Sequence, residues 1–253
     1  MKLILLRPER QTAPLPGILW IHGGGYTTGM ASMVYASCGR MLAKKYGAVV
    51  LSPEYRLSGK APYPAALEDC FAALQYMSAQ ARELGVDPGR IVVGGESAGG
   101  GLAAAVCLYA RDRSGIHIAY QLPLYPMLDC EDTPSSADNH APGWNTRRNR
   151  RGWSRYLGEL YGTDRVPSYA SPSRETDCRG LPPCYTFVCE GEPFRDETLT
   201  YVRRLREAGV EANADVYPGS LHAFDGLFWT KRAKQARRRL CEVYEEALRR
   251  GVI

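Results

Sequence analysis

The sequence predicts an α/β domain with a mostly parallel central sheet flanked by helices. The first indication is that short apolar runs alternate with segments of helical periodicity along most of the chain, because parallel strands need a crossover between them that is usually a helix. The second is size, since 253 residues with 45% hydrophobic and 23% charged residues suit one sizeable core better than two. No linker divides the chain, so we expect a single domain over residues 1–253.

Seven short apolar runs are the expected strands of this sheet. They are Lys2–Leu6, Gly17–Ile21, Ala48–Ser52, Arg90–Val93, Ile118–Leu124, Tyr185–Glu190 and Ala212–Tyr217. The clearest helix is Ala65–Leu84, whose apolar side chains recur at helical spacing along one face. The tripeptide Asp87-Pro88-Gly89 then predicts a turn before the next strand.

Residues 129–172 interrupt this alternation. The segment is polar and rich in turn-forming residues, with a helix expected near Arg151–Tyr161. We interpret it as an insertion between two strands that forms a cap, an element that can lie over an active site. Its aromatic residues Trp144, Trp153 and Tyr156 are expected to leave apolar surface that a second copy of the chain could cover in a homodimer.

Composition and charge argue against a nucleic-acid partner and against a membrane span. The net charge of 32 − 27 = +5 is mild, and the arginine-dense pieces lack the aromatic interleaving of nucleic-acid-binding surfaces. No apolar stretch approaches the roughly 18 residues that span a bilayer, and the N-terminus lacks the apolar core of a signal peptide. Eight scattered cysteines without a C-x-x-C pair predict free thiols and a cytoplasmic location.

The stretch RIVVGGESAGGGLAAAV, residues 90–106, contains more glycines than a turn needs. It fits neither common phosphate-binding loop, because no lysine follows Gly100 and the glycine spacing of dinucleotide-binding loops is missing. The segment Gly95-Glu96-Ser97-Ala98-Gly99 instead fits G-x-S-x-G between a strand and a helix, where a strained turn exposes a nucleophilic serine. Ser97 is therefore the candidate nucleophile.

A serine nucleophile needs an oxyanion hole. The glycine-rich loop WIHGGGYTTG, residues 20–29, follows an earlier strand and offers the backbone N–H groups of Gly24 and Gly25. Together with the N–H of Ala98, these groups could converge on a carbonyl oxygen that becomes an oxyanion. His22, in the same loop, is expected to fix the loop by hydrogen bonds rather than take part in the chemistry.

A serine nucleophile also needs a base, and the chain has four histidines. His222 is the best candidate because it follows the last strand, at the carboxyl edge of the sheet where sites of α/β proteins form. The carboxylate that orients it should follow the preceding strand, where four acids are available: Glu190, Glu192, Asp196 and Glu197. The residue pattern leaves all four open. The chain order serine, acid, histidine is that of α/β-hydrolases.

These motifs together resemble the hormone-sensitive-lipase-like family of bacterial esterases, which has the α/β-hydrolase fold. The resemblance extends over nearly the whole chain, through HGGGY, EYRLSGKAPYPAALED, DPGRIVVGGESAGGGLA, LPLYPMLD, EGEPFRDE and YPGSLHAF. By this resemblance the family's acid falls on Glu192. The implied site consists of a nucleophile, a base, an acid and three oxyanion donors: Ser97, His222, Glu192, Gly24, Gly25 and Ala98.

Several features depart from the family pattern. Glu96 and Ala223 stand where the family usually has Asp and Gly, and Glu192 replaces an Asp. Only 21 residues precede His22, whereas family members usually carry several tens of residues there that form a strand and lid helices. We therefore expect a reduced cap and an open, shallow site.

The resemblance implies a serine carboxylesterase that hydrolyses short-chain acyl esters through an acyl-enzyme intermediate, without metal or cofactor. A deacetylase of acetylated carbohydrates is a narrower version, and an amidase or peptidase on the same scaffold is an alternative. A non-catalytic small-molecule-binding protein is the alternative from another class. Plant gibberellin receptors resemble this family but have lost the catalytic histidine, which is present here as His222. A metal hydrolase is disfavoured because H-x-x-E-H or paired histidine spacing is missing.

Overall fold

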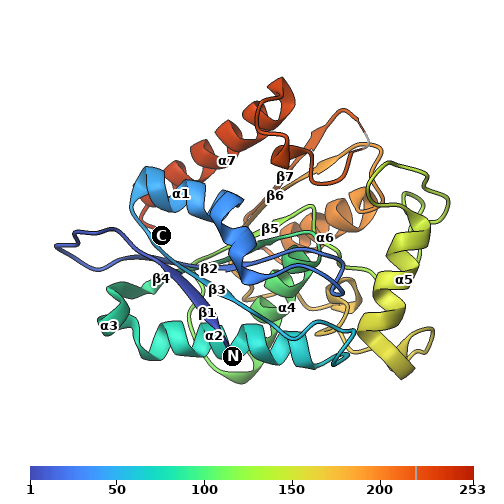
Figure 1. The fold of residues 1–253 in the computed structure, drawn as a ribbon, viewed down its shortest axis with the longest axis horizontal. Coiled ribbons are helices and arrows are strands. Elements are labelled where there is room, and N and C mark those ends of the chain that lie inside the picture. The colour runs from blue at the N-terminus through green and yellow to red at the C-terminus, as the bar shows by residue number, and fades with distance from the viewer. Residues whose placement is uncertain (220) are drawn as a thin grey trace.

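The computed structural model describes residues 1–219 and 221–253, and it contains one seven-stranded sheet between two layers of helices (Figure 1). The strand order is β1-β3-β2-β4-β5-β6-β7, and every neighbouring pair is parallel except β1 with β3. The predicted fold class, an α/β-hydrolase fold with a mostly parallel sheet, is confirmed.

All seven predicted runs are strands in the structure. Their bounds are β1 Leu3–Leu6, β2 Leu15–Ile21, β3 Val49–Pro53, β4 Val86–Glu96, β5 Tyr120–Leu124, β6 Cys184–Cys189 and β7 Ala212–Tyr217. The prediction of a turn before β4 at Asp87-Pro88-Gly89 was wrong, because these residues lie within the bounds of β4. They form an irregularity in the pairing with β2, where Leu15 pairs with Val86 but Gly17 pairs with Ile91.

Helices cover both faces of the sheet, with α1 and α7 on one face and α2, α4 and α6 on the other (Figure 1). Their bounds are α1 Cys38–Tyr46, α2 Ala65–Ala79, α3 Ala81–Leu84, α4 Ala98–Arg113, α5 Thr146–Leu157, α6 Arg195–Glu207 and α7 Lys231–Arg249. Short 3-10 segments are η1 Ala31–Ala36, η2 Gly158–Leu160, η3 Pro172–Arg174 and η4 Phe224–Gly226. The single helix predicted over Ala65–Leu84 is interrupted at Gln80, where ψ is 19°.

The alternation of side chains along β2 shows how the two layers share the core. Leu19 and Ile21 pack into the core beneath α2 and α4, whereas Ile18 and Trp20 pack into the core beneath α1 and α7. All four side chains are fully buried. Since successive residues of a strand point to opposite faces, a continuous apolar run is what a sheet covered on both sides requires.

The segment 129–172 lies between β5 and β6, and its main element is α5. The predicted helix began too late, because the Asn145 side chain accepts a hydrogen bond from the Arg148 N–H at 3.2 Å and so caps a helix whose first residue is Thr146. The predicted exposure of Trp153 and Tyr156 was wrong. Both are 1% exposed, and the Tyr156 ring stacks on that of Tyr26 at 3.9 Å. Two residues three apart on a helix share a face, and here that face points inward.

Among the described residues, no helix combines the length and the apolar composition that crossing a bilayer demands.

Candidate active site

Ser97 occupies the sharp turn between β4 and α4. Its φ of 59° and ψ of −122° are a sparsely populated conformation for a residue with a side chain. The turn needs glycine on both sides: a Cβ at Gly95 would lie 2.4 Å from the Gly99 carbonyl oxygen, and one at Gly99 would lie 2.2 Å from the Ile21 carbonyl oxygen. The G-x-S-x-G spacing therefore lets the strand, the helix and β2 approach closely while Ser97 stays on the turn.

A chain of hydrogen bonds runs from Ser97 through His222 to Glu192. The Ser97 Oγ lies 2.8 Å from the His222 Nε2, and the His222 Nδ1 bonds to the Glu192 Oε2. The other carboxylate oxygen, Oε1, accepts the Cys189 N–H at 2.6 Å, which holds the fully buried Glu192 side chain in place at the end of β6. The structure thus brings together the serine, the histidine and one of the four candidate acids.

The other three acids point elsewhere. Asp196 lies in the first turn of α6, as predicted, and accepts hydrogen bonds from the Ser135 N–H and the Arg195 guanidinium, both at 2.8 Å. Glu197 accepts the Leu128 N–H at 2.6 Å. Glu190 is exposed. Only Glu192, among these four, is hydrogen-bonded to His222 in the part of the chain that the structure describes.

The remaining histidines are not in this arrangement. His117 and His140 are exposed, and the His140 Nε2 lies 2.9 Å from Asp138. His22 is buried, its ring stacks on Tyr55 at 4.1 Å, and its Nδ1 lies 2.8 Å from the Gly23 carbonyl oxygen. Burial lowers the pKa of His22, so a neutral ring that donates its Nδ1–H to Gly23 fits this contact. This supports the predicted role of His22 in holding the loop.

The glycine-rich loop after β2 lies against the serine. Gly24 and Gly25 have φ values of 125° and 58°, which side chains rarely adopt. Across the described residues, neither of their N–H groups donates a hydrogen bond to another backbone group. Ala98 is the first residue of α4, so its N–H also lacks a partner within the helix. These three N–H groups are therefore the candidate donors to an oxyanion beside Ser97.

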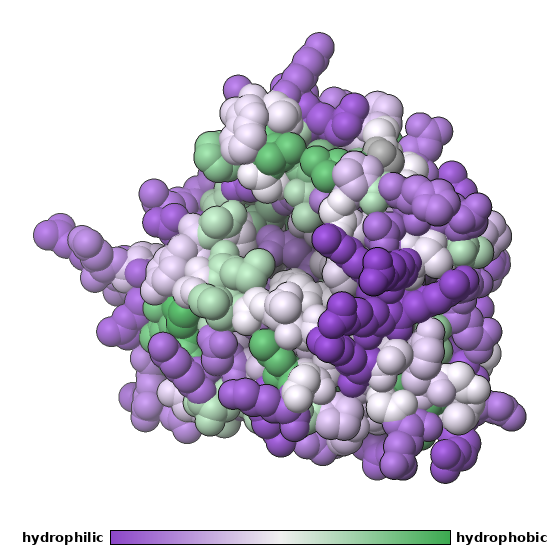
Figure 2. Space-filling view, turned by 45° about the vertical axis from the view of Figure 1, so that its right-hand side comes forward, coloured by the Kyte–Doolittle hydropathy of each residue, from purple (hydrophilic) through white to green (hydrophobic). Residues whose placement is uncertain are grey.

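A cleft of about 340 Å³ opens over Ser97 and His222. Its walls come from the glycine-rich loop and from three further segments: η1 through Met33, the turn after β5 through Tyr125, and the segment 129–172 through Trp144. Figure 2 shows the molecule hollowed on the side turned forward, with hydrophobic surface on part of the rim and strongly hydrophilic surface on another part.

The sequence did not predict the aromatic surroundings of His222. The rings of Tyr125 and Phe194 meet the imidazole edge-on, with centroids 5.1 and 5.0 Å away. Tyr125 directly follows β5, so its position at the carboxyl edge of the sheet was the sequence feature that could have placed it near the site. These rings fix the imidazole plane between Ser97 and Glu192.

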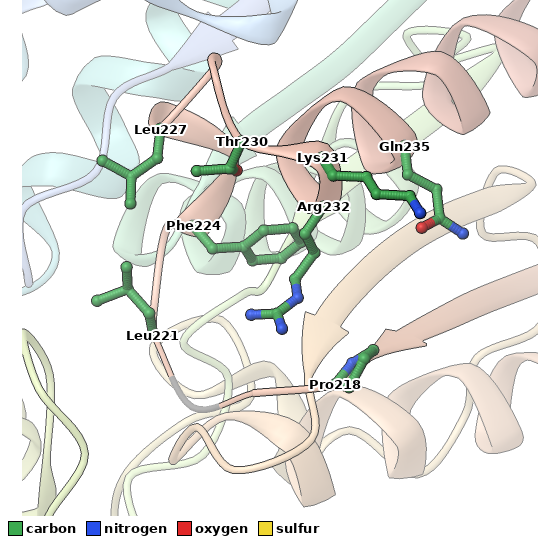
Figure 3. Close-up of a pocket in the computed structure, with 8 residues that line it drawn as sticks. All are labelled: Pro218, Leu221, Phe224, Leu227, Thr230, Lys231, Arg232 and Gln235. Atoms are coloured by element: carbon green, nitrogen blue, oxygen red, sulfur yellow. The ribbon is translucent and has the colours of Figure 1, made fainter.

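A second cavity, of about 480 Å³, lies beside the start of α7 (Figure 3). It is lined by Pro218, Leu221, Phe224, Leu227, Thr230, Lys231, Arg232 and Gln235. None of these is Ser97, His222 or Glu192, whereas Ser97 and His222 both line the smaller cleft.

Replacing Gly25 by alanine tests the oxyanion loop. The new Cβ would lie 2.1 Å from the Trp144 ring, and the φ of 58° would strain it further. Alanine keeps the backbone N–H, but relieving this clash moves it out of place, so we expect kcat to fall by roughly 10²-fold or more, the usual cost of losing one oxyanion donor. Gly47→Ala is the matched control, because Gly47 also has a positive φ (71°) but a Cβ added there would meet no atom within 4 Å. Equal losses in the two variants would exclude a role for the Gly25 N–H.

The fold, with this arrangement at the carboxyl edge of the sheet, is that of an α/β hydrolase. A family model described as alpha/beta hydrolase fold matches residues 18–226. The chain belongs to this family, in its hormone-sensitive-lipase-like esterase branch, and the resemblance seen in the sequence is confirmed.

Similar proteins are named as esterases. Esterase LipI of Mycobacterium tuberculosis is 35% identical over 87% of this chain and 68% of its own length. Carboxylesterase NlhH of the same species is 34% identical over 83% of this chain and 66% of its own length. The solved structure titled Bacterial Heroin Esterase superposes with a TM-score of 0.92 at 38% identity, covering 99% of this chain and 79% of that one. The chain thus spans about two thirds of the length of these curated relatives.

Proposed function

We propose that this protein is a serine carboxylesterase in which Ser97, His222 and Glu192 form the catalytic triad. Hydrolysis of carboxylic esters is supported by the family and by relatives named carboxylesterase and esterase. The observation that carries the assignment of residues is the continuous hydrogen-bonded chain from Ser97 Oγ through both ring nitrogens of His222 to the buried Glu192 carboxylate.

The hydrogen-bonded chain supports a mechanism in which the proton of Ser97 moves to His222. The Ser97 Oγ attacks the ester carbonyl carbon while the His222 Nε2, 2.8 Å away, takes its proton. The N–H groups of Gly24, Gly25 and Ala98 stabilise the oxyanion, and the Glu192 carboxylate stabilises the imidazolium. The proton then passes to the leaving alkoxide, which departs as the alcohol. Water attacks the acyl-enzyme by the same steps, releasing the acid and restoring Ser97.

The size of the cleft sets the acyl preference that we propose. A volume of about 340 Å³ lies at the low end of the roughly 300–1,000 Å³ of ligand pockets. Each buried CH₂ contributes about 0.8 kcal/mol, or about fourfold in kcat/KM, but only while a wall receives it. We expect kcat/KM on p-nitrophenyl esters to rise from acetyl to butyryl and to stop rising beyond about four carbons. A maximum at octanoyl or longer would contradict this preference.

Activity on acetylated sugars is the narrower proposal for the alcohol side, because the cleft is open to solvent beside a partly polar rim. Acetylated xylo-oligosaccharides, assayed beside p-nitrophenyl acetate, measure it directly. If acetate were released from p-nitrophenyl acetate but not from the acetylated oligosaccharides, the proposed activity on sugars would be wrong.

We further propose a reducing, cytoplasmic location, supported by eight free cysteines of which seven are buried as small apolar side chains. The homodimer predicted from the sequence stays a prediction. Trp153 and Tyr156 cannot form its interface, because both side chains are buried. Size-exclusion chromatography with light scattering measures the mass in solution.

A further inference from the structure

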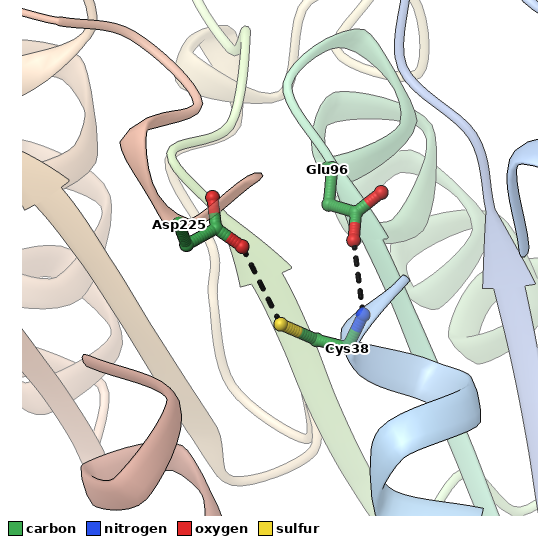
Figure 4. Close-up of side chains that lie close together, drawn as sticks. All are labelled: Cys38, Glu96 and Asp225. Atoms are coloured by element: carbon green, nitrogen blue, oxygen red, sulfur yellow. Dashed lines mark hydrogen bonds between the residues drawn. The ribbon is translucent and has the colours of Figure 1, made fainter. Parts of the chain in front are cut away.

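Three side chains that could bind a cation meet behind the catalytic turn. Cys38 is the first residue of α1, Glu96 is the last residue of β4, and Asp225 lies in η4. One sulfur or oxygen atom from each lies within 4.8 Å of those of the other two. Figure 4 shows the Asp225 carboxylate pointing toward the Cys38 thiol from one side and the Glu96 carboxylate reaching the start of α1 from the other.

Cys38 donates one hydrogen bond to each of the two carboxyl groups of the cluster. The Cys38 Sγ–H donates to the Asp225 Oδ2 at 3.4 Å, and the Cys38 N–H donates to the Glu96 Oε1 at 3.3 Å. The Asp225 side chain is 3% exposed, yet within the described chain its Oδ1 has no hydrogen-bond partner. A buried carboxylate oxygen without a donor is costly. The side chains that hydrogen-bond to this carboxylate are neutral, the Cys38 thiol and the Tyr125 hydroxyl, so a cation would add the charged partner that they do not provide.

Burial and mutual repulsion favour the protonated forms of the groups in this cluster. Burial, with the Asp225 carboxylate as the next cause, raises the pKa of Glu96 to about 8. The same two causes raise the pKa of the Cys38 thiol well above its usual range. The charge of Arg237 lowers the pKa of both groups, but within the described structure Arg237 makes no hydrogen bond or ion pair with either of them. The Cys38 thiol and the Glu96 carboxyl therefore hold their protons near neutral pH, and a cation that binds here has to displace them.

We propose that Cys38, Glu96 and Asp225 form a binding site for a soft divalent cation, Zn²⁺ being the best match. One thiolate with two carboxylates is a ligand set that Zn²⁺ accepts, at about 2.3 Å from sulfur and about 2.0–2.2 Å from oxygen, with a fourth position left to water. Two ligands at these distances from one tetrahedral ion lie about 3.3–3.7 Å apart, so ligand atoms that now lie within 4.8 Å of one another have to draw together when the ion binds. The thiol proton leaves to solvent when the ion binds.

Ion binding at this site inhibits the esterase. Glu96 and Asp225 line the same cleft as Ser97 and His222, which gives the ion its path of entry. The bound charge opposes the positive charge that His222 must carry during the reaction. Pulling Glu96 toward Cys38 also displaces the residue next to Ser97. The inhibition rests on the proposed triad, whereas the binding itself does not.

Metal titration of chelator-treated protein tests this site. Zn²⁺ binding is measured by calorimetry together with hydrolysis of p-nitrophenyl butyrate, and Co²⁺ serves as a spectroscopic probe. We expect one Zn²⁺ per chain with loss of activity, and a near-ultraviolet thiolate-to-cobalt band. Cys38→Ala should keep its activity without metal and need at least about 100-fold more Zn²⁺, because losing even an outer partner of a metal site costs roughly 10- to 100-fold.

Cys241→Ala is the matched control, since Cys241 is a buried thiol in α7 beneath the same face of the sheet. It should bind Zn²⁺ as the unchanged protein does. Ser97→Ala should also bind normally, which separates this proposal from the triad. Zn²⁺ inhibition that persists undiminished in Cys38→Ala would place the ion on His222 and overturn the site. Absence of the cobalt band in the unchanged protein would overturn it without any variant.

Discussion

Replacing Ser97 by alanine is expected to lower kcat for p-nitrophenyl butyrate by roughly 10⁴-fold or more, with little change in KM. The variant loses the atom that forms the acyl-enzyme, and only the oxyanion donors and binding remain to assist water. Ser97 is buried (7% exposed), but the substitution removes only its hydroxyl, which is hydrogen-bonded to His222, so the fold should keep its packing. Stopped-flow or steady-state hydrolysis measures the loss, and thermal unfolding checks that the variant is folded.

Covalent labelling supplies the control for this prediction. A fluorophosphonate should modify the unchanged protein once, on the peptide that contains Ser97, and should leave Ser97→Ala unlabelled. Ser173→Ala is the matched variant, because Ser173 is also a buried serine (8% exposed) but lies in η3. It should be labelled and active. A second labelled serine, or an alanine variant with substantial activity, would remove Ser97 from the mechanism.

The sheet and the nucleophile could be predicted from the sequence because both depend on local rules. A strand buried on both faces requires a continuous apolar run, as in β2, whichever helices cover it. The turn at Ser97 requires Gly95 and Gly99, because the backbone of Ile21 and of α4 lies where their side chains would be. Signals of this kind lie within a few residues of one another.

Features set by distant contacts were not predictable in the same way. The chain near the end of β6 offers four acids within eight residues, and only the position of His222 in space selects among them. Trp153 and Tyr156 looked exposed in a polar segment, yet Tyr26, more than a hundred residues earlier, supplies the surface that buries them. The cluster of Cys38, Glu96 and Asp225 comes from three separate segments and has no sequence motif.

The second large effect is expected at the acid, where two carboxylates four residues apart can be compared directly. Glu192→Gln keeps the shape of the side chain and an oxygen for the Cys189 N–H, but it loses the charge that stabilises the His222 imidazolium and fixes its tautomer. We expect kcat to fall by roughly 10²- to 10⁴-fold. Asp196→Asn removes a carboxylate that bonds to Ser135 and Arg195 instead, so kcat should fall by less than about tenfold, with a small loss of stability at the start of α6. The measurement is kcat for both variants at pH 8, beside their unfolding midpoints. A greater loss of kcat in Asp196→Asn, in a folded protein, would assign the orienting role to Asp196 and require the loop after β6 to rearrange during turnover.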